Sequence, residues 1–125
     1  MNTPRNLKYT KTHEWLLEQD GEYLIGITDH AQSELGDIVF INLPVVDTGI
    51  MSGDALADVE SVKAVSDVIS PVTGVISAVN EELADNPEKL NEKPYEAWIA
   101  KVREVTQADQ LLTAEEYEDF TKSEA

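Results

Sequence analysis

Lys63 lies at the centre of the segment whose residue types and spacing most clearly suggest chemistry. Two short β-prone runs, residues 55–59 and 65–69, flank it, so a chain that folds back between them carries Lys63 on the tip of a hairpin. The tip residues Val62 and Lys63 include no Gly, Asn or Asp, which favours a plain type I turn. The neighbouring side chains are small and leave the amine accessible. A modifying enzyme could therefore acylate Lys63 and convert its ammonium into a neutral amide.

Most surface lysines are only solvated charges, and the predicted hairpin is what sets Lys63 apart from them. A lysine in a desolvated pocket can act as a catalyst, whereas a lysine held in solvent on a rigid tip offers an attachment point. We therefore expect Lys63 to carry a group rather than to catalyse a reaction.

Convincing catalytic machinery is missing elsewhere in the sequence. Carboxylates are abundant, and Glu14, Glu60 and Asp67 could lie near the hairpin, but no Ser-His or Cys-His constellation accompanies them. The six glycines are scattered singly, so there is no glycine-rich phosphate loop. The sequence predicts a protein that is not an enzyme.

The two histidines, His13 and His30, are far apart and form no HxH or HxxxH pair. Because metal sites usually show such spacing, we expect ordinary surface or packing roles for both and no metal site. Alternation along a strand predicts that one of His13 and Glu14 faces outward.

Composition narrows the class of protein and its partners. The 125 residues suit one domain, 1–125, with a modest core, and an apolar fraction of 42% argues against wholesale disorder. Nine basic residues against 25 acidic ones give a net charge of −16, which disfavours nucleic acid and anionic membranes as partners. The charge either steers the chain toward basic docking surfaces or only confers solubility.

Targeting signals are not apparent. No apolar stretch suits a signal peptide or a membrane span, and no Arg/Ser-rich transit segment precedes the fold. With no cysteine in the chain, a reducing compartment fits. We expect a complete, unprocessed, cytoplasmic protein of bacterial type that acts as a monomer.

The elements that must position Lys63 follow from turn, capping and periodicity signals. We expect strands at 9–18, 22–28, 37–43, 55–59, 65–70, 75–79 and 98–102, turns at 19–22, 47–49, 52–54 and 71–74, and helices at 31–35, 107–112 and 114–122. Residues 80–94 are expected to be irregular or weakly helical.

Thr28 or Asp29 caps the first helix and Gly36 ends it, while Thr113 and Glu116 form a capping box. The stripe expected to be buried at the C-terminal end is Leu111, Leu112, Tyr117 and Phe120. Such short strands predict a mainly β fold, a small barrel or sandwich with helices at its edges.

Several blocks of the sequence form a recognisable ordered pattern. Around Lys63 the blocks are Val59-Glu60-Ser61-Val62-Lys63-Ala64, then Ser66-Asp67-Val68 and Ser70-Pro71-Val72-Thr73-Gly74, and they resemble the lipoyl-attachment segment of one known family, the glycine cleavage system H proteins. Similar blocks are Tyr9-Thr10-Lys11-Thr12-His13-Glu14-Trp15, Gly26-Ile27-Thr28-Asp29-His30-Ala31-Gln32, Leu35-Gly36-Asp37-Ile38-Val39-Phe40, Asn91 with Pro94-Tyr95 and Trp98, and Leu111-Leu112 with Glu116-Tyr117. The resemblance covers roughly residues 7 to 120, and several blocks in order are far more specific than one motif.

The resemblance implies a lipoyl-domain-like fold, a flattened β-barrel or sandwich (a barrel-sandwich hybrid) with peripheral helices, and lipoate in amide linkage on Lys63. It implies that the dithiolane accepts an aminomethyl group as the P protein, glycine decarboxylase, decarboxylates glycine. The T protein, an aminomethyltransferase, then passes the one-carbon unit to tetrahydrofolate, and the L protein, dihydrolipoyl dehydrogenase, reoxidises the dithiol. Lipoate ligase or lipoyl transferase would be the modifying partner, and the cofactor would do the chemistry.

The resemblance also implies a cleft that shelters the loaded arm, and Thr12, Glu14 and Asp67 could line it here. Glu14 could pair with the aminomethyl ammonium. Two departures stand out. The stretch from Pro94 to Trp98 lacks glycine and is shorter than usual, and Glu34 stands where some plant relatives have a histidine.

Alternatives remain at this stage. Biotinyl domains usually flank the lysine with methionines, and lipoyl domains of 2-oxo-acid dehydrogenases usually place Asp before it, so Val62 and Ala64 fit neither well. An H-like protein that relays lipoyl or octanoyl groups to other enzymes, and an unmodified acidic adaptor, are the other two readings.

Overall fold

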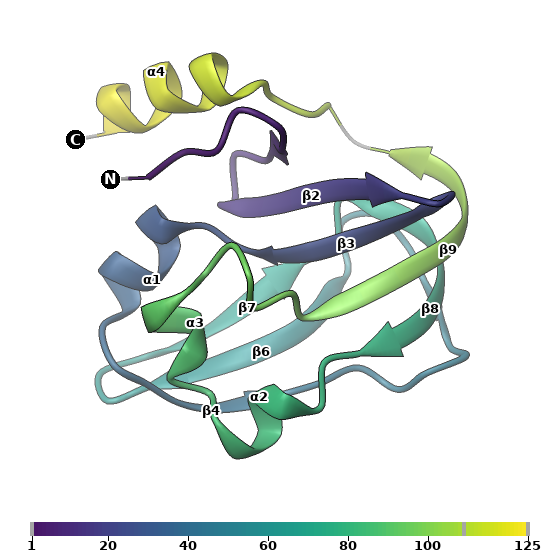
Figure 1. Cartoon of the computed structure of the whole chain (residues 1–125), viewed down its shortest axis with the longest axis horizontal. Helices are drawn as coiled ribbons and strands as arrows, with labels where there is room; N and C mark the ends of the chain where they lie inside the picture. The colour runs from purple at the N-terminus through teal and green to yellow at the C-terminus, as the bar shows by residue number, and fades with distance from the viewer. Residues whose placement is uncertain (1, 109, 125) are drawn as a thin grey trace.

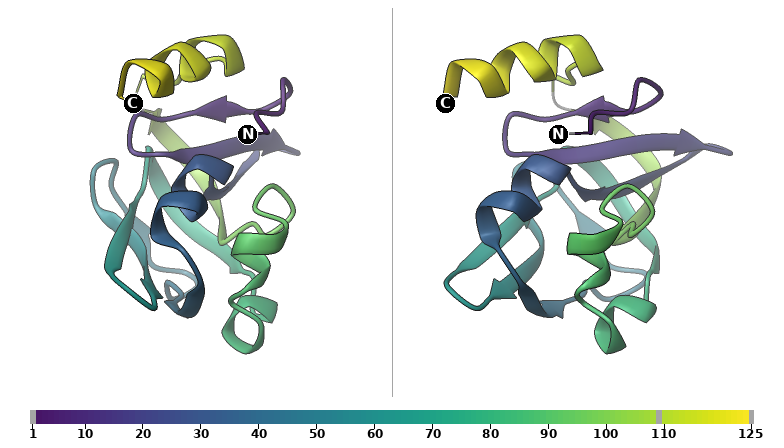
Figure 2. Two further views of the ribbon diagram at one scale, coloured as in Figure 1. Left: turned by 90° about the vertical axis from the view of Figure 1, so that its left-hand side faces the viewer. Right: turned by 60° about the vertical axis from the view of Figure 1, so that its left-hand side comes forward.

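The computed structural model describes residues 2–108 and 110–124, which form two antiparallel sheets with helices around them (Figures 1 and 2). The larger sheet has the strand order β1-β2-β3-β9-β8-β5, and the smaller has the order β4-β6-β7. The strands are β1 Lys8–Tyr9, β2 Glu14–Gln19, β3 Glu22–Ile27, β4 Ile38–Asn42, β5 Gly49–Ile50, β6 Ala55–Ser61, β7 Val65–Ile69, β8 Val72–Val79 and β9 Ala100–Ala108. The helices are α1 Asp29–Leu35, α2 Glu82–Asp85, α3 Lys89–Glu92 and α4 Ala114–Glu124. The predicted mainly β sandwich with peripheral helices is confirmed.

Local signals set several elements as predicted. Asp20 and Gly21 both adopt positive φ, 54° and 82°, as a two-residue hairpin between β2 and β3 requires. Thr28 accepts the backbone N–H of Ala31 at the start of α1, and Gly36 ends that helix with φ 79°. Each of these short-range predictions is confirmed because the contacts lie within a few residues of one another.

The C-terminal capping box is also confirmed. The backbone N–H of Thr113 donates to Glu116 Oε1 at 2.8 Å, and the backbone N–H of Glu116 donates to Thr113 Oγ1 at 3.2 Å. α4 then packs its buried face on β1, where the rings of Tyr9 and Tyr117 stack with centroids 4.7 Å apart. In the predicted stripe Leu112 and Tyr117 are buried, while Leu111 and Phe120 are half-buried.

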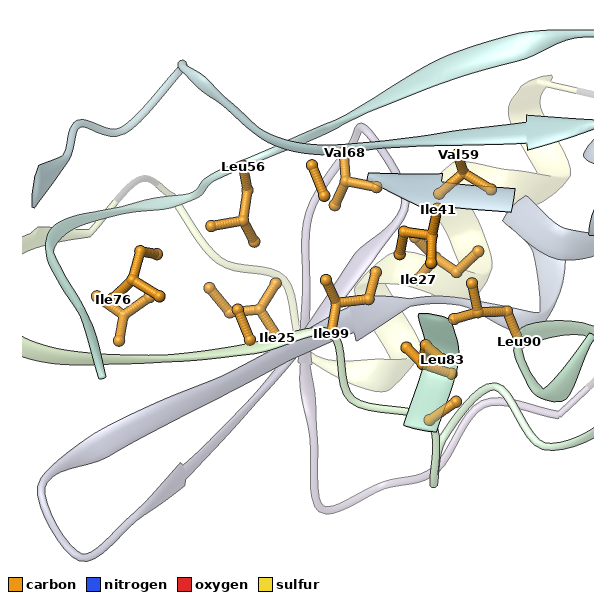
Figure 3. Packing of buried hydrophobic residues seen from close by; sticks show 14 of the residues in the cluster. Ile25, Ile27, Ile41, Leu56, Val59, Val68, Ile76, Leu83, Leu90 and Ile99 are labelled. Atoms are coloured by element: carbon orange, nitrogen blue, oxygen red, sulfur yellow. The ribbon is translucent and has the colours of Figure 1, made fainter. Parts of the chain in front are cut away.

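The main core lies between the two sheets and under α2 and α3. Figure 3 shows side chains from both sheets meeting there, with Ile25 and Ile76 from the larger sheet and Val59 and Val68 from the smaller one. Leu83 of α2 and Leu90 of α3 complete it, both fully buried. Burial of each such side chain contributes about 1.5–3 kcal/mol, so this core fixes how the smaller sheet sits on the larger.

Several local predictions are wrong. The single strand expected at 9–18 is two strands, β1 and β2, because the chain turns at residues 11–13 between them. Residues 72–74 do not continue a turn but begin β8, because the chain bends only at Pro71 as it passes from the smaller sheet to the larger. The predicted helix at 107–112 is wrong for the described residues: β9 runs to Ala108, Leu112 forms an isolated bridge with Tyr9, and residue 109 lies outside the described part of the chain. β9 also starts at Ala100 rather than at residue 98. In the last three cases pairing with a distant strand overrides local preference.

The helices within the described residues are all too short or too polar to cross a membrane. The segment 80–94, expected to be irregular or weakly helical, holds the two four-residue helices α2 and α3.

Candidate functional site

The hairpin of β6 and β7 carries Lys63 at its tip, as the sequence predicts. Glu60 pairs with Val65, and the backbone N–H of Ser61 donates to the carbonyl of Ala64 at 2.8 Å, which leaves Val62 and Lys63 as the turn. Neither turn residue adopts a positive φ, in agreement with an ordinary turn. Lys63 is exposed.

The side chain of Ser61 fixes this turn. Its Oγ accepts hydrogen bonds from the backbone N–H groups of Lys63, at 3.3 Å, and of Ala64, at 3.1 Å. The N–H of Val62 donates to the carbonyl of Asp37 at 3.0 Å, which ties the tip to the loop between α1 and β4. The lysine therefore stands on a braced support, while its own side chain stays free.

Gly36 leaves room for that side chain. A Cβ atom at this position would lie 3.5 Å from Cε of Lys63, so the lysine stem passes directly over the glycine. The positive φ that lets Gly36 end α1 thus also brings bare backbone beside the Lys63 stem.

The outer face of the smaller sheet changes character with distance from the tip. Nearest Lys63 a cross-strand row joins Phe40, Glu60 and Val65, whose directly paired side chains share one face. Phe40 and Val65 are 45% and 67% exposed, and Val62 on the tip is 70% exposed. The next row is polar and acidic, with Asn42, Asp58 and Asp67 paired across the strands. We call the two rows the outer face of the β4-β6-β7 sheet.

A pocket of about 250 Å³ opens beside the far end of β7. Its lining residues are Thr10, Lys11, Thr12, Glu14, Ile69, Pro71 and Gln110. Two of the three predicted cleft residues, Thr12 and Glu14, therefore line one pocket. The third, Asp67, is not among its lining residues; it is exposed on β7, two residues before Ile69 and on the same side of that strand. The sequence did not single out Thr10, Ile69, Pro71 or Gln110, because only folding brings them beside Glu14.

Glu14 is only 2% exposed. Its Oε1 accepts from Oγ1 of Thr10 at 2.6 Å and from Oγ1 of Thr12, and its Oε2 accepts from the N–H of Ile69 at 3.3 Å. Burial raises the pKa of the Glu14 carboxyl above its usual value, and these hydrogen bonds oppose the rise.

Glu14 has polar partners but no cation. Among the ion pairs of the described residues none includes Glu14. Lys11 lines the same pocket, yet its ammonium lies over the ring of Phe120, 5.7 Å from the centroid. A buried carboxylate without a cation gains most from a cationic group that enters the pocket.

His13 and Glu14 do not alternate as predicted. Both are turned inward: His13 precedes β2, has a left-handed φ of 73° and is half-buried, and Glu14 is buried. The prediction that one of them faces outward is wrong because the strand begins only at Glu14. The left-handed residue turns the histidine ring toward α1 and α4, where it stacks on His30.

The short segment from Pro94 to Trp98 is held by hydrogen bonds to distant parts of the chain. Its Pro94 carbonyl accepts the indole N–H of Trp15 at 3.0 Å, and the hydroxyl of Tyr95 donates to the carbonyl of Asn2 at 2.7 Å. The loop packs beside α1 and the N-terminal segment, away from the β6-β7 tip (Figure 1).

A family model described as glycine cleavage H-protein matches residues 7–124. The chain belongs to this family. A glycine cleavage system H protein of Lachnoclostridium phytofermentans is 54% identical over 125 residues, covering 99% of this chain and 98% of that protein. One from Listeria innocua is 51% identical over 121 residues, covering 94% and 97%. A probable glycine cleavage system H protein of Pyrococcus furiosus is 51% identical over 121 residues, covering 94% and 90%.

The fold of this H-protein family member also matches a solved structure. The crystal structure of a glycine cleavage system H protein from Mycobacterium marinum superposes with a TM-score of 0.90 at 38% identity, covering 95% of this chain and 98% of that one. The resemblance read from the ordered blocks is thereby confirmed, and the residues that the family model matches, 7–124, include the hairpin, the pocket and α4.

Proposed function

We propose that this chain is the lipoyl-carrying shuttle subunit of glycine cleavage, with lipoate joined by an amide bond to Nζ of Lys63, and that residues 1–125 work as one carrier domain. The family supports the carrier role in this system. The observation that carries the assignment to Lys63 is its place on an exposed turn, braced by Ser61 and by the carbonyl of Asp37. In this role the chain carries the lipoyl group, and its partner enzymes catalyse the reactions.

The residues around Lys63 fit a long acyl arm. The amine is exposed, the stem crosses Gly36 without a side chain in its way, and β7 is an edge strand that leaves one side of the hairpin open to a ligase. When attached, lipoate supplies a dithiolane that accepts the aminomethyl group released as glycine is decarboxylated. The later steps of the cycle depend on which parts of the chain's surface the lipoyl arm can reach.

From Lys63 the arm has a route along the outer side of β7, past Asp67 and Ile69, to the pocket of Thr12 and Glu14. Glu14 is the group in that pocket able to pair with an ammonium carried on the arm, because it is buried and joins no ion pair among the described residues. Thr10 and Thr12 hold its carboxylate in place. Sheltering the cargo there would protect it from water between visits to the partner enzymes.

The partners we propose are the P, T and L proteins and the lipoate ligase or lipoyl transferase that modifies Lys63. The outer face of the β4-β6-β7 sheet suits transient docking, since the exposed Phe40 and Val65 flank Glu60 in the row next to the tip and the acidic row lies behind it. Weak, charge-guided contacts allow the fast exchange of partners that a shuttle needs.

Intact-mass measurement tests the attachment. The chain is incubated with lipoate, ATP and lipoate ligase, alongside Lys63→Arg and the matched control Lys8→Arg, an exposed lysine on β1. We expect one lipoyl-sized increment on the unaltered chain and on Lys8→Arg, and none on Lys63→Arg. A chain that stays unmodified would support the acidic adaptor instead.

Glycine–bicarbonate exchange with the P protein separates glycine cleavage from lipoyl relay. The lipoylated chain should support exchange, whereas a pure relay protein would be modified but inactive in this assay.

The sheltering role of Glu14 is tested with Glu14→Ala, for which we expect faster loss of the methylamine-loaded arm and a changed transfer rate to the T protein. Unchanged stability and transfer would refute that role while leaving Lys63 as the attachment site.

A further inference from the structure

The two histidines of the chain, distant in sequence, lie ring against ring. The centroids of His13 and His30 are 4.4 Å apart at an interplanar angle of 29°. His13 comes from the turn before β2 and His30 from the first turn of α1, and the last turn of α4 brings Glu124 beside them. Figure 1 shows α1 and the C-terminal end of α4 on the same side of the molecule.

Nitrogen and oxygen atoms converge at this cluster. Glu124 Oε1 lies 3.1 Å from Nε2 of His13 and 3.8 Å from Nε2 of His30, and the potential ligand atoms of the three residues all lie within 4.8 Å of one another. Two ligands of a tetrahedral zinc ion, each bonded at about 2.0–2.1 Å, stand about 3.3 Å apart. The observed separations bracket that value.

His30 Nε2 is a buried nitrogen without a hydrogen bond in the described part of the chain. Glu34 Oε1 is 2.8 Å away, but it does not meet the directional geometry of a hydrogen bond. A buried polar atom left in this way costs free energy, and a metal ion in the cluster would satisfy it.

His13 is oriented as metal-binding histidines are. Its Nδ1 is 2.7 Å from the hydroxyl of Tyr117, which is in turn 2.8 Å from Oγ1 of Thr28. With Nδ1–H donating to Tyr117, the neutral ring turns the lone pair of Nε2 toward the carboxylate of Glu124. Two electron-rich groups at 3.1 Å need a proton or a cation between them, and an outer hydrogen bond of this kind commonly fixes a zinc-bound histidine.

We propose that His13, His30 and Glu124 bind a divalent first-row transition metal ion, and that Zn²⁺ is the best match. Imidazole nitrogens with carboxylate oxygens suit this ion, and the chain has no cysteine to compete for it. Two neutral imidazoles and one carboxylate would hold the ion and leave its fourth position open. The ion would staple the end of α4 to α1 and to the turn before Glu14, independently of Lys63.

Zinc titration by calorimetry tests the proposal on the metal-free full-length chain at pH 7.5. We expect one equivalent of Zn²⁺ to bind, and His30→Gln or Glu124→Gln to weaken the affinity by at least about tenfold. The matched control is Asp119→Asn, an exposed carboxylate on the same helix, which should bind as the unaltered chain does. Since Glu124 is at the exposed end of α4, its variant is expected to fold, which circular dichroism checks.

Imidazole NMR resonances give a second measurement, because the chain has only these two histidines. One equivalent of Zn²⁺ should shift the signals of both rings, whereas adsorption to the acidic surface would leave them in place. The absence of stoichiometric binding, or equal binding by Glu124→Gln, His30→Gln and Asp119→Asn, would overturn the proposal.

Discussion

The carboxylate of Glu14 accepts a hydrogen bond from the backbone N–H of Ile69 at 3.3 Å, which joins the start of β2 in the larger sheet to the end of β7 in the smaller one. β7 is the strand that leaves the Lys63 turn. A single buried side chain therefore connects the pocket with the hairpin that we propose to bear lipoate.

Replacing Glu14 with Gln should change how stability depends on pH. Burial raises the folded-state pKa of Glu14, so the folded chain binds this proton more tightly than the unfolded chain does. The tighter proton binding by Glu14 therefore stabilises the folded chain fully at pH values below the pKa of Glu14 in the unfolded chain. This stabilisation is lost as the pH rises through the pKa of Glu14 in the folded chain. The free energy of unfolding of the unaltered chain minus that of Glu14→Gln should therefore fall from pH 4 to pH 7, at no more than about 1.4 kcal/mol per pH unit.

Urea unfolding at several pH values measures this difference. Only the difference between the two chains is interpreted, since other titrating groups are common to both. A difference that increases with pH would mean that the hydrogen bonds to Glu14 outweigh its burial.

Gly26→Ala should destabilise the chain by about 1–3 kcal/mol. Gly26 is paired with Trp15 across β2 and β3, and a Cβ atom there would come within 2.6 Å of the indole ring. The ring would have to move and strain its hydrogen bond to Pro94. Thermal or urea unfolding measures the loss, and Gly49→Ala is the matched control, because its Cβ would meet nothing closer than 3.9 Å. Equal stability of the two variants would contradict the close packing of Trp15.

Ser61→Ala should slow the modification of Lys63 without unfolding the chain. The serine hydroxyl holds two backbone N–H groups of the turn, and loss of a hydrogen bond worth about 1 kcal/mol lets the tip sample other shapes. We expect a lipoylation rate lower by up to about tenfold in a timed intact-mass assay. The control is Ser66→Ala, an exposed serine on β7, whose rate should match the unaltered chain. If both variants react equally, turn rigidity does not matter to the ligase.

Thr113→Ala should cost about 1 kcal/mol of stability, because it removes the N-terminal cap of α4. Fraying there would loosen the stacking of Tyr117 on Tyr9. Urea unfolding measures the cost, and Thr121→Ala within the same helix should cost less, since its hydroxyl only returns to the carbonyl of Glu118. A larger effect at residue 121 would show that the cap is not what holds the helix.

Interactions between residues close in sequence allowed the sequence alone to determine many local elements of this protein. The hairpin at Lys63, the caps of α1 and α4, and the Asp20-Gly21 turn each depend on residues within a few positions of one another, so their types alone predict them. The ordered blocks likewise predicted the family. The turn at 71–74 and the helix at 107–112 were wrong because strand pairing over long sequence separations outweighed their local preferences.

Only the tertiary structure decided what surrounds the lysine. Glu14 becomes a buried carboxylate because two sheets close over it, and Ile69 donates a hydrogen bond to it from a strand far along the chain. His13 meets His30 because a left-handed residue turns one ring toward α1, which no spacing motif announces. The attachment point is a local property of the hairpin, whereas the pocket and the histidine cluster exist only once distant segments pack together.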